Sequence, residues 1–140
     1  MRVFLDTNVL VYLFDGDSPA KQERVREVVA EVARARSLVL SSQVLRELYV
    51  TITRNLAQPV PVPEATALRA LEDLAAFPVV AVDATLVQRA AARSAAEQVS
   101  YWDALILEAA VEAGAAIVYS EDLQAGSAYA GVTVEDPFAG

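Results

Sequence analysis

Short apolar runs, many of them β-branched, alternate with helical patterns along the 140-residue chain, and this alternation limits the possible folds more than any other feature. Such runs favour strands, and they lie at about residues 3–5, 37–40, 79–82, 116–119 and 132–134. Each run is apolar on both faces, which is typical of parallel strands that helices cover on both sides. The pattern therefore predicts an α/β fold, a three-layer sandwich around a central, mainly parallel sheet of four to five strands.

Amphipathic helices are expected between these strands. Residues 20–34, for example, place four valines on one stripe and charged residues on the other side. Further helices are expected at about residues 9–14, 42–53, 64–75, 83–94 and 101–113. The proline-rich segment 58–63 lacks several amide donors and is expected to be a loop between two helices. No repeat and no second domain is visible, so residues 1–140 are expected to form one domain.

The composition excludes several kinds of catalytic site. The chain has no cysteine and no histidine, which rules out thiol nucleophiles, thiolate or imidazole zinc sites and Ser-His-Asp triads. Its net charge is −8 and Lys21 is its only lysine, which argues against a nucleic-acid binder that neutralises phosphates with basic side chains. If the substrate is RNA or DNA, bound cations have to bring it to the protein.

The N-terminus carries no targeting signal that the sequence reveals. A strand pattern follows Met1-Arg2 directly, without the apolar stretch of a secretory signal, and no run of about 18 apolar residues occurs. No membrane span is expected, and the sequence favours a cytoplasmic location.

Acidic residues fall where the strands of a parallel sheet end. Asp6 directly follows the first expected strand, and Asp122 closely follows the fourth. Glu47 lies in the second turn of the helix after the second strand, and Asp103 in the first turn of the helix that leads to the fourth. Ligands of open parallel sheets bind outside the carboxyl ends of the strands, so several acids are expected to converge there.

Each of these acids also has a purely structural explanation. Asp6 can cap the first helix, and Ser100 with Asp103 has the spacing of a capping box. Asp122 can lie in a surface loop without a role. Glu47 can rim a cleft or face solvent, and helical geometry does not decide between the two.

Helical geometry does add information for Asp103. At about 100° per residue this acid shares a face with Ile106 and Ala110, whereas Glu108 and Glu112 lie nearly opposite and mark an expected solvent side. An ionised carboxylate that points towards a buried face is costly unless a positive or hydrogen-bonding group receives it. The position therefore favours a functional role for Asp103.

Several carboxylates in one cleft repel one another, which raises pKa values and destabilises the fold. A divalent hard cation removes this difficulty, because Mg²⁺ and Mn²⁺ take oxygen ligands and bridge readily to phosphate oxygens. Such an ion also lowers the pKa of a bound water and stabilises the oxygens of a phosphodiester under attack. Metals rather than lysines would then meet the phosphate of a nucleic acid.

Four short motifs follow one another in the sequence. They are Leu5-Asp6-Thr7-Asn8, Glu47 after Ser41-Ser42, Tyr101-Trp102-Asp103-Ala104, and Ser120-Glu121-Asp122-Leu123. The ordered set covers nearly the whole chain and resembles the signature of the PIN-domain family, in particular the VapC-type toxin ribonucleases of bacterial toxin–antitoxin pairs. Each motif alone is weak, but the set in this order and spacing is specific.

The resemblance implies a set of site residues. The catalytic and metal-binding acids, which would hold one or two Mg²⁺ or Mn²⁺ ions, would be Asp6, Glu47, Asp103 and Asp122. Thr7 and Ser120 match hydroxyl positions that support the acids or contact substrate, and Asn8 would steady the turn after the first strand. Glu121 could compete with Asp122 for its role.

The resemblance also implies an activity and partners. The protein would hydrolyse RNA phosphodiesters, leaving a 5′-phosphate and a 3′-hydroxyl. It would form a homodimer and would also bind a cognate antitoxin that blocks the cleft. One alternative is a PIN-fold interaction module without activity. Another is an aspartate-based phosphoryl-transfer protein, but such proteins need a second Asp where Asn8 stands or a late lysine, and Lys21 is early.

Other polar and aromatic residues are expected to have structural roles. Asp15 and Asp17 are expected to form a turn, and Asp83 a helix cap. Exposed arginines could touch RNA phosphates but usually only solvate a helix, and this applies to Arg46, Arg54 and Arg93. Core or interface positions, rather than base-stacking positions, are expected for Tyr12, Tyr49 and Trp102.

Overall fold

The computed structural model describes residues 1–55 and 61–139, so residues 58–60 of the loop expected over 58–63 lie outside the described residues. The strands are β1 (Arg2–Leu5), β2 (Leu38–Ser41), β3 (Val79–Val80), β4 (Ala115–Tyr119), β5 (Ala128–Tyr129) and β6 (Val132–Glu135). The helical segments are α1 (Thr7–Leu10), η1 (Val11–Phe14), α2 (Pro19–Arg34), α3 (Ser42–Val50), η2 (Thr51–Asn55), α4 (Glu64–Leu74), α5 (Ala84–Glu97) and α6 (Tyr101–Glu112).

The strands form one sheet in the order β3-β2-β1-β4-β6-β5. β1 is central and pairs in parallel with both neighbours, so that Phe4 lies opposite Val39 on β2 and Val118 on β4. β3 and β6 extend the parallel sheet at its two sides, and β5 pairs antiparallel with β6. The expected α/β fold with a mainly parallel sheet is confirmed.

The sheet has one strand more than the upper estimate from the sequence. β5 contains only two residues, and its link to β6 is a tight turn in which Ala130 and Gly131 have φ values of 48° and 87°. Two consecutive residues with positive φ are typical of the two-residue hairpin turns that join antiparallel strands. Ala-Gly is a weak sequence signal for such a turn, which explains why the strand was not expected.

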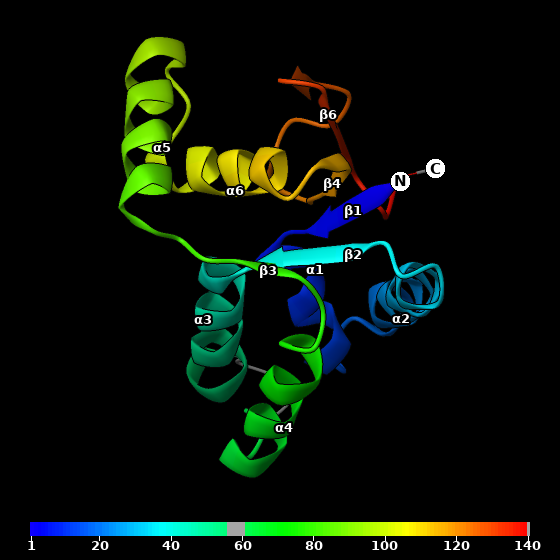
Figure 1. Ribbon diagram of the computed structural model, residues 1–140. Helices are drawn as coiled ribbons and strands as arrows, with labels where there is room; N and C mark the ends of the chain where they lie inside the picture. The colour runs from blue at the N-terminus through cyan, green and yellow to red at the C-terminus, as the bar shows by residue number, and fades with distance from the viewer. Residues whose placement is uncertain (56–60, 140) are drawn as a thin grey trace.

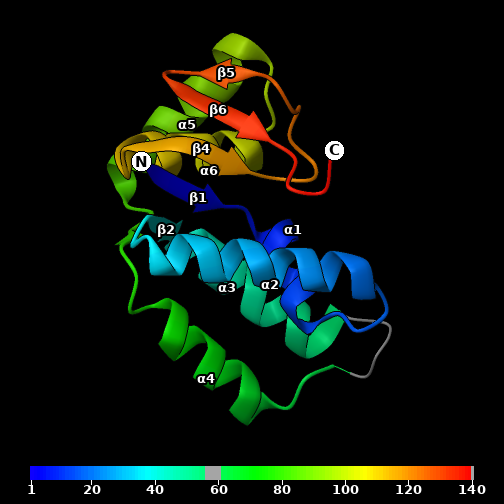
Figure 2. The same cartoon turned by 90° about the vertical axis from the view of Figure 1, so that its right-hand side faces the viewer.

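Helices cover both faces of the sheet and one of its edges. α6 packs on one face with α5 outside it, and α2 lies on the opposite face (Figures 1 and 2). α3 and α4 contact each other and extend beyond the edge formed by β2 and β3 (Figure 1). Within the described ranges, no helix combines the length and the apolar character that a membrane crossing requires. The arrangement leaves the carboxyl ends of β1 and β4 facing a space between α3 and α6.

The expected solvent side of α6 is wrong at one of its two residues. Glu108 is only 5% exposed, and all residues from Ala104 to Ala110 are buried. The reason is that α6 is enclosed between the sheet and α5. The Glu108 carboxylate is compensated there by Arg93 Nε on α5 at 3.2 Å and by the Tyr129 hydroxyl on β5 at 2.8 Å.

Removing the positively charged side chain of Arg93 beside Glu108 is expected to destabilise the fold. Arg93→Met should lower the free energy of unfolding by about 2 kcal/mol, because it leaves a buried carboxylate with one hydrogen bond fewer. Arg89→Met on the same helix breaks only the exposed pair with Glu112 and should cost no more than about 0.5 kcal/mol. Urea denaturation of both variants measures the difference, and equal effects would contradict the role given to Glu108.

Candidate active site

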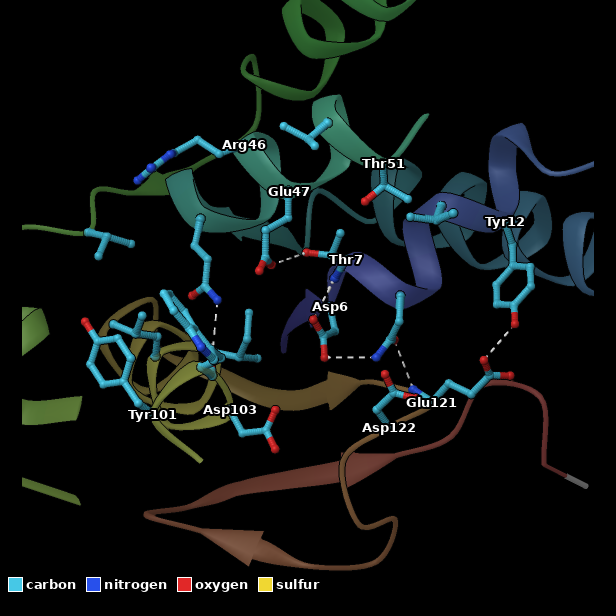
Figure 3. Close-up of a pocket in the computed structure, with 18 of the residues that line it drawn as sticks. Asp6, Thr7, Tyr12, Arg46, Glu47, Thr51, Tyr101, Asp103, Glu121 and Asp122 are labelled. Carbon is cyan, nitrogen blue, oxygen red and sulfur yellow. Dashed lines mark hydrogen bonds between the residues drawn. The ribbon is translucent and has the colours of Figure 1, made fainter. Parts of the chain in front are cut away.

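A cleft of about 1030 Å³ lies at the carboxyl ends of β1 and β4, between α3 and α6. It is lined by all four acids that the sequence singled out, which come from four separate segments of the chain: Asp6, Glu47, Asp103 and Asp122. Figure 3 shows Asp6 at the centre, with Glu47 on one side and Asp103 and Asp122 on the other. The sequence therefore located these residues at one place on the fold.

Asp6 is the buried member of the group, with 7% exposure. Its Oδ1 accepts a hydrogen bond from Thr7 N at 2.7 Å, so the residue does cap α1, as its structural explanation required. Its Oδ2 accepts from Ser120 Oγ at 2.9 Å and from Asn8 Nδ2 at 3.3 Å. Capping thus occupies one oxygen, while the other belongs to a network that reaches β4.

Burial dominates the electrostatics of Asp6. The pKa of this carboxyl is raised from 3.8 to about 6, mainly by desolvation and to a smaller extent by the negative charges of Glu47 and Asp103, while hydrogen bonds from Ser120 and Thr7 act in the opposite direction. The described residues provide no ion pair for any of the four acids. Their mutual repulsion is therefore not relieved by a basic side chain.

Ser120 and Asn8 join the ends of β1 and β4. The buried Ser120 hydroxyl donates to Asp6 and accepts from Asp122 N at 3.3 Å and Leu123 N at 3.1 Å. Asn8 donates to both Asp6 and Ser120 and accepts from Glu121 N at 3.1 Å. The two residues hold the Asp6 turn and the loop that carries Asp122 in a fixed relation, which matches the steadying role expected for Asn8.

Glu47 is exposed and projects from α3 at the rim of the cleft, where its Oε1 accepts a hydrogen bond from Thr7 Oγ1 at 2.9 Å. This answers the question that helical geometry left open. Thr7 is buried next to Asp6, so its hydroxyl connects the central acid to the acid on α3. The contact joins segments that are 40 residues apart in the sequence.

Asp103 takes part in a helix cap and also lines the cleft. Ser100 caps α6, because its hydroxyl accepts from Asp103 N at 3.1 Å. The Asp103 carboxylate is half-buried and faces the cleft (Figure 3). The backbone of Asp103 thus serves the cap, while its side chain is available to the site.

Glu121 and Asp122 have different surroundings. Glu121 forms an ion pair with Lys21. It also accepts a hydrogen bond from the Tyr12 hydroxyl at 2.7 Å, which Figure 3 shows. Burial raises the pKa of Glu121, but the hydrogen bonds from Lys21 and Tyr12 outweigh it and leave the pKa below its ordinary value. Asp122 is exposed, and within the described residues it is held through its backbone N–H, which donates to Ser120. The geometry favours Asp122 as the acid available to a ligand.

The acids suit a divalent cation by their chemistry, although no finished metal centre exists among the described residues. With the side chains as they stand, no three acids in those ranges lie close enough to hold one ion. The donors are carboxylate oxygens without ion pairs, which are the ligands that Mg²⁺ and Mn²⁺ prefer. Side-chain rotation of the exposed Glu47 and Asp122 would be needed to complete a coordination sphere around Asp6.

Sequence reasoning missed Gln43 and did not place Trp102 in the cleft. Gln43 is 7% exposed and lines the cleft one helical turn before Glu47, a spacing of four residues that could have revealed it. Trp102 was expected in the core or an interface, yet it is 63% exposed and lines the same cleft. Tyr12 and Tyr49 are partly buried, as a structural role requires.

Asp15, Asp17 and Asp83 have the structural roles that were expected, whereas Arg93 pairs with the buried Glu108 instead of only solvating a helix. Asp15 accepts from Asp17 N in a turn, and Asp83 caps α5 through Leu86 N. Among the three arginines, Arg93 pairs with Glu108, whereas Arg46 lies on the rim of the cleft. Arg54 is exposed.

A parallel α/β sandwich with a cleft of carboxylates at its strand ends defines a class of protein, and comparison with known families identifies it. The PIN domain family matches residues 3–129, and the chain belongs to this family. Membership disfavours the aspartate-based phosphoryl-transfer alternative, as does Lys21, which bonds Glu121 and Tyr12 instead of approaching Asp6. No curated protein matches the sequence.

Several solved structures have the same fold. VapC20 of Mycobacterium tuberculosis, described as a Sarcin-Ricin loop cleaving toxin, is 20% identical with a TM-score of 0.63, covering 86% of this chain and 89% of its own. A chain of a toxin–antitoxin complex from Klebsiella pneumoniae is 18% identical with a TM-score of 0.70, at 99% and 98% coverage. A chain of DNA-bound VapBC from Salmonella typhimurium is 22% identical with a TM-score of 0.65, at 98% coverage of both chains. These similarities establish the fold.

Proposed function

We propose that residues 1–140 form a single nuclease domain that hydrolyses RNA phosphodiesters with one or two Mg²⁺ or Mn²⁺ ions. The observation that carries the proposal is the convergence of Asp6, Glu47, Asp103 and Asp122 in one cleft without a basic partner among the described residues. A protein has little reason to keep four such acids together unless a cation neutralises them. When bound, the ion would supply an activated water and stabilise charge on the phosphate oxygens.

The protein's own part is to hold the acids in position. Asp6 is fixed by Thr7 N, Ser120 and Asn8, so its carboxylate can accept a cation without losing its orientation. Glu47 is steadied by the Thr7 hydroxyl. These hydrogen bonds orient ligands from outside the coordination sphere, which is a common requirement of metal sites.

The net charge of −8 supports cation-dependent binding of RNA. A chain with one lysine and an acidic cleft repels phosphates, so its association with RNA should depend on the divalent ion and not on a basic surface. Arg46 at the rim is the cleft-lining arginine and could meet one phosphate. The metal thus has two roles in the proposal, in substrate binding and in hydrolysis.

The biological role that we propose is that of a toxin in a type II toxin–antitoxin pair, acting in the cytoplasm as a homodimer. The support is the fold shared with VapC20, with the toxin–antitoxin complex from Klebsiella pneumoniae and with DNA-bound VapBC. A cognate antitoxin would then cover the cleft. A small reading frame beside the gene, with a DNA-binding N-terminus, would support this role.

A PIN-fold interaction module without activity is the second candidate. It is favoured by one observation, that no three acids of the described part of the chain are close enough to hold an ion. Titration calorimetry with Mn²⁺ separates the two candidates. The nuclease should bind Mn²⁺ in a carboxylate-dependent manner, whereas the interaction module should not.

Cleavage of RNA by the purified protein tests the proposed function. We expect cleavage of single-stranded RNA with Mn²⁺ or Mg²⁺ and none with excess EDTA. Asp122→Asn should lower the rate by about a hundredfold or more, because it removes an anionic oxygen ligand. Glu121→Gln should retain most activity, because its carboxylate is engaged by Lys21 and Tyr12. Cleavage that is undiminished in EDTA would contradict the mechanism.

A further inference from the structure

The cleft continues beyond the acids into a region of different character. This region is formed by α3, α5, α6 and the segment before α5, and its lining residues are Gln43, Val82, Val87, Trp102 and Leu105. An ion with six waters fills roughly 200 Å³, at about 30 Å³ for each water. The cleft measures about 1030 Å³, so it has room for part of a substrate as well as for ions.

Trp102 is an unusual residue to leave in solvent. It is the only tryptophan of the chain, it is 63% exposed, and it directly precedes Asp103 on α6. Its ring contacts Tyr101 edge to face, with centroids 5.0 Å apart and planes at 69°. Tyr101 contacts the indole on one side only, and a large part of the ring remains exposed to solvent. An open aromatic face beside an acidic site suits a nucleobase, because every base can stack on it.

Gln43 adds a polar group to the same region. Its side chain is buried, and its Nε2 donates to the carbonyl oxygen of Trp102 at 3.5 Å. In the described part of the chain, its Oε1 is the one buried side-chain polar atom without a hydrogen-bond partner. Such an atom costs free energy unless something outside the chain satisfies it. The missing partner has to be a donor, because an amide oxygen only accepts.

We infer that this part of the cleft is a nucleobase subsite, in which a base stacks on Trp102 and donates an N–H to Gln43 Oε1. The inference rests on the proposed function, because it places one nucleotide of the RNA substrate beside the acids. Gln43 and Glu47 lie one turn apart on α3, and Trp102 and Asp103 are adjacent on α6. A base held by Gln43 and Trp102 therefore brings the phosphate of its nucleotide towards the neighbouring acids, Glu47 and Asp103.

The alternative occupant of an exposed tryptophan is a second copy of the chain. The surroundings of Trp102 favour the base, because a dry protein interface would leave the Gln43 oxygen unsatisfied, and because Asp103 and Glu47 share the cleft. Charged groups are depleted from the cores of protein interfaces. Two further acids within the same hollow therefore fit a nucleotide with its counter-ion better than an apolar partner.

Titration with nucleosides tests the subsite without any cleavage. The single tryptophan gives one indole N–H resonance in isotope-labelled protein, and nucleosides carry a base but no phosphate, so the acids do not repel them. In EDTA we expect adenosine, cytidine and uridine to shift this resonance saturably, whereas ribose should not. N6,N6-dimethyladenosine, which stacks but has no N–H on its base, should bind about threefold to tenfold more weakly than adenosine.

The variant Gln43→Met keeps the size of the side chain and removes its acceptor. In this variant adenosine and N6,N6-dimethyladenosine should bind equally, and Trp102→Leu should raise KM for RNA more than it lowers kcat. The inference is overturned if nucleosides leave the indole resonance unchanged, or if the two adenosines bind wild-type protein equally. It is also overturned if the resonance moves with protein concentration instead, which would make Trp102 a contact between copies. Nucleoside binding without RNA cleavage would refute the proposed function alone.

Discussion

Asp6→Asn is expected to reduce the rate of metal-dependent RNA cleavage by about a thousandfold or more, a larger loss than we expect from Asp122→Asn. Asn keeps the shape of the side chain and can still accept from Thr7 N as the cap of α1. What it removes is the negative charge at the centre of the four acids. A metal site of this kind lowers the activation barrier by several kcal/mol, which corresponds to about a factor of a thousand in rate. Single-turnover cleavage of a labelled oligoribonucleotide in Mn²⁺ measures the effect.

Asp83→Asn is the matched control for this substitution. Asp83 caps α5 by accepting from Leu86 N, so the chemical change is the same at a helix cap that does not line the cleft. The control variant should cleave RNA at nearly the wild-type rate. Comparable cleavage by Asp6→Asn would mean that Asp6 only caps α1, and the role proposed for the four acids would then be abandoned.

The position of the central acids could be predicted from the sequence because it depends on topology alone. Parallel strands bring their carboxyl ends to one edge of the sheet, so residues after β1 and β4 had to be neighbours once those strands paired. The places of Glu47 and Asp103 in the helices after β2 and before β4 added two more acids, and the resemblance to a known family then assigned all four to one site. Neither inference required knowledge of how any side chain packs.

The details around the acids depend on packing, and the sequence could not supply them. The contact of Thr7 with Glu47 depends on which face α3 turns towards α1, and this orientation is determined by the packing of α3 against the sheet and α1. The periodicity of α6 placed Glu108 on a solvent side, whereas α5 covers this residue and supplies Arg93 to it. Hydrophobic periodicity predicts the buried side of a helix that packs against one apolar surface. It fails for α6, because α6 packs against the sheet on one side and against α5 on the other.

The exposure of Trp102 also could not be predicted from the hydrophobic pattern of the sequence. A tryptophan in the first turn of an apolar helix usually marks the core, since large aromatic side chains contribute most by burial. The environment of Gln43 could not be predicted either, because its burial and its unsatisfied oxygen depend on how α3 packs beside α6.

The ionised Asp6 side chain is expected to destabilise the metal-free protein near neutral pH. Burial raises its pKa in the folded state from 3.8 to about 6, so between these values the folded protein binds more protons than the unfolded chain. The free energy of unfolding therefore falls as pH rises from about 4 to above 6, by about 3 kcal/mol for a change of this size. Asp6→Asn has no such proton to lose, and its stability relative to wild type should increase by the same amount.

Thermal or urea unfolding of both proteins in EDTA, at pH 4 and at pH 7.5, measures this difference. The variant should be comparable to wild type at the lower pH and clearly more stable at the higher one. Mn²⁺ should then raise the stability of wild type at pH 7.5 and leave that of Asp6→Asn nearly unchanged, because ligand binding stabilises only the folded state that binds it. A stability difference between the two proteins that is constant with pH would show that the Asp6 carboxylate is already neutralised by another group. In that case the Asp6 side chain would no longer support the proposal that the cleft binds a cation.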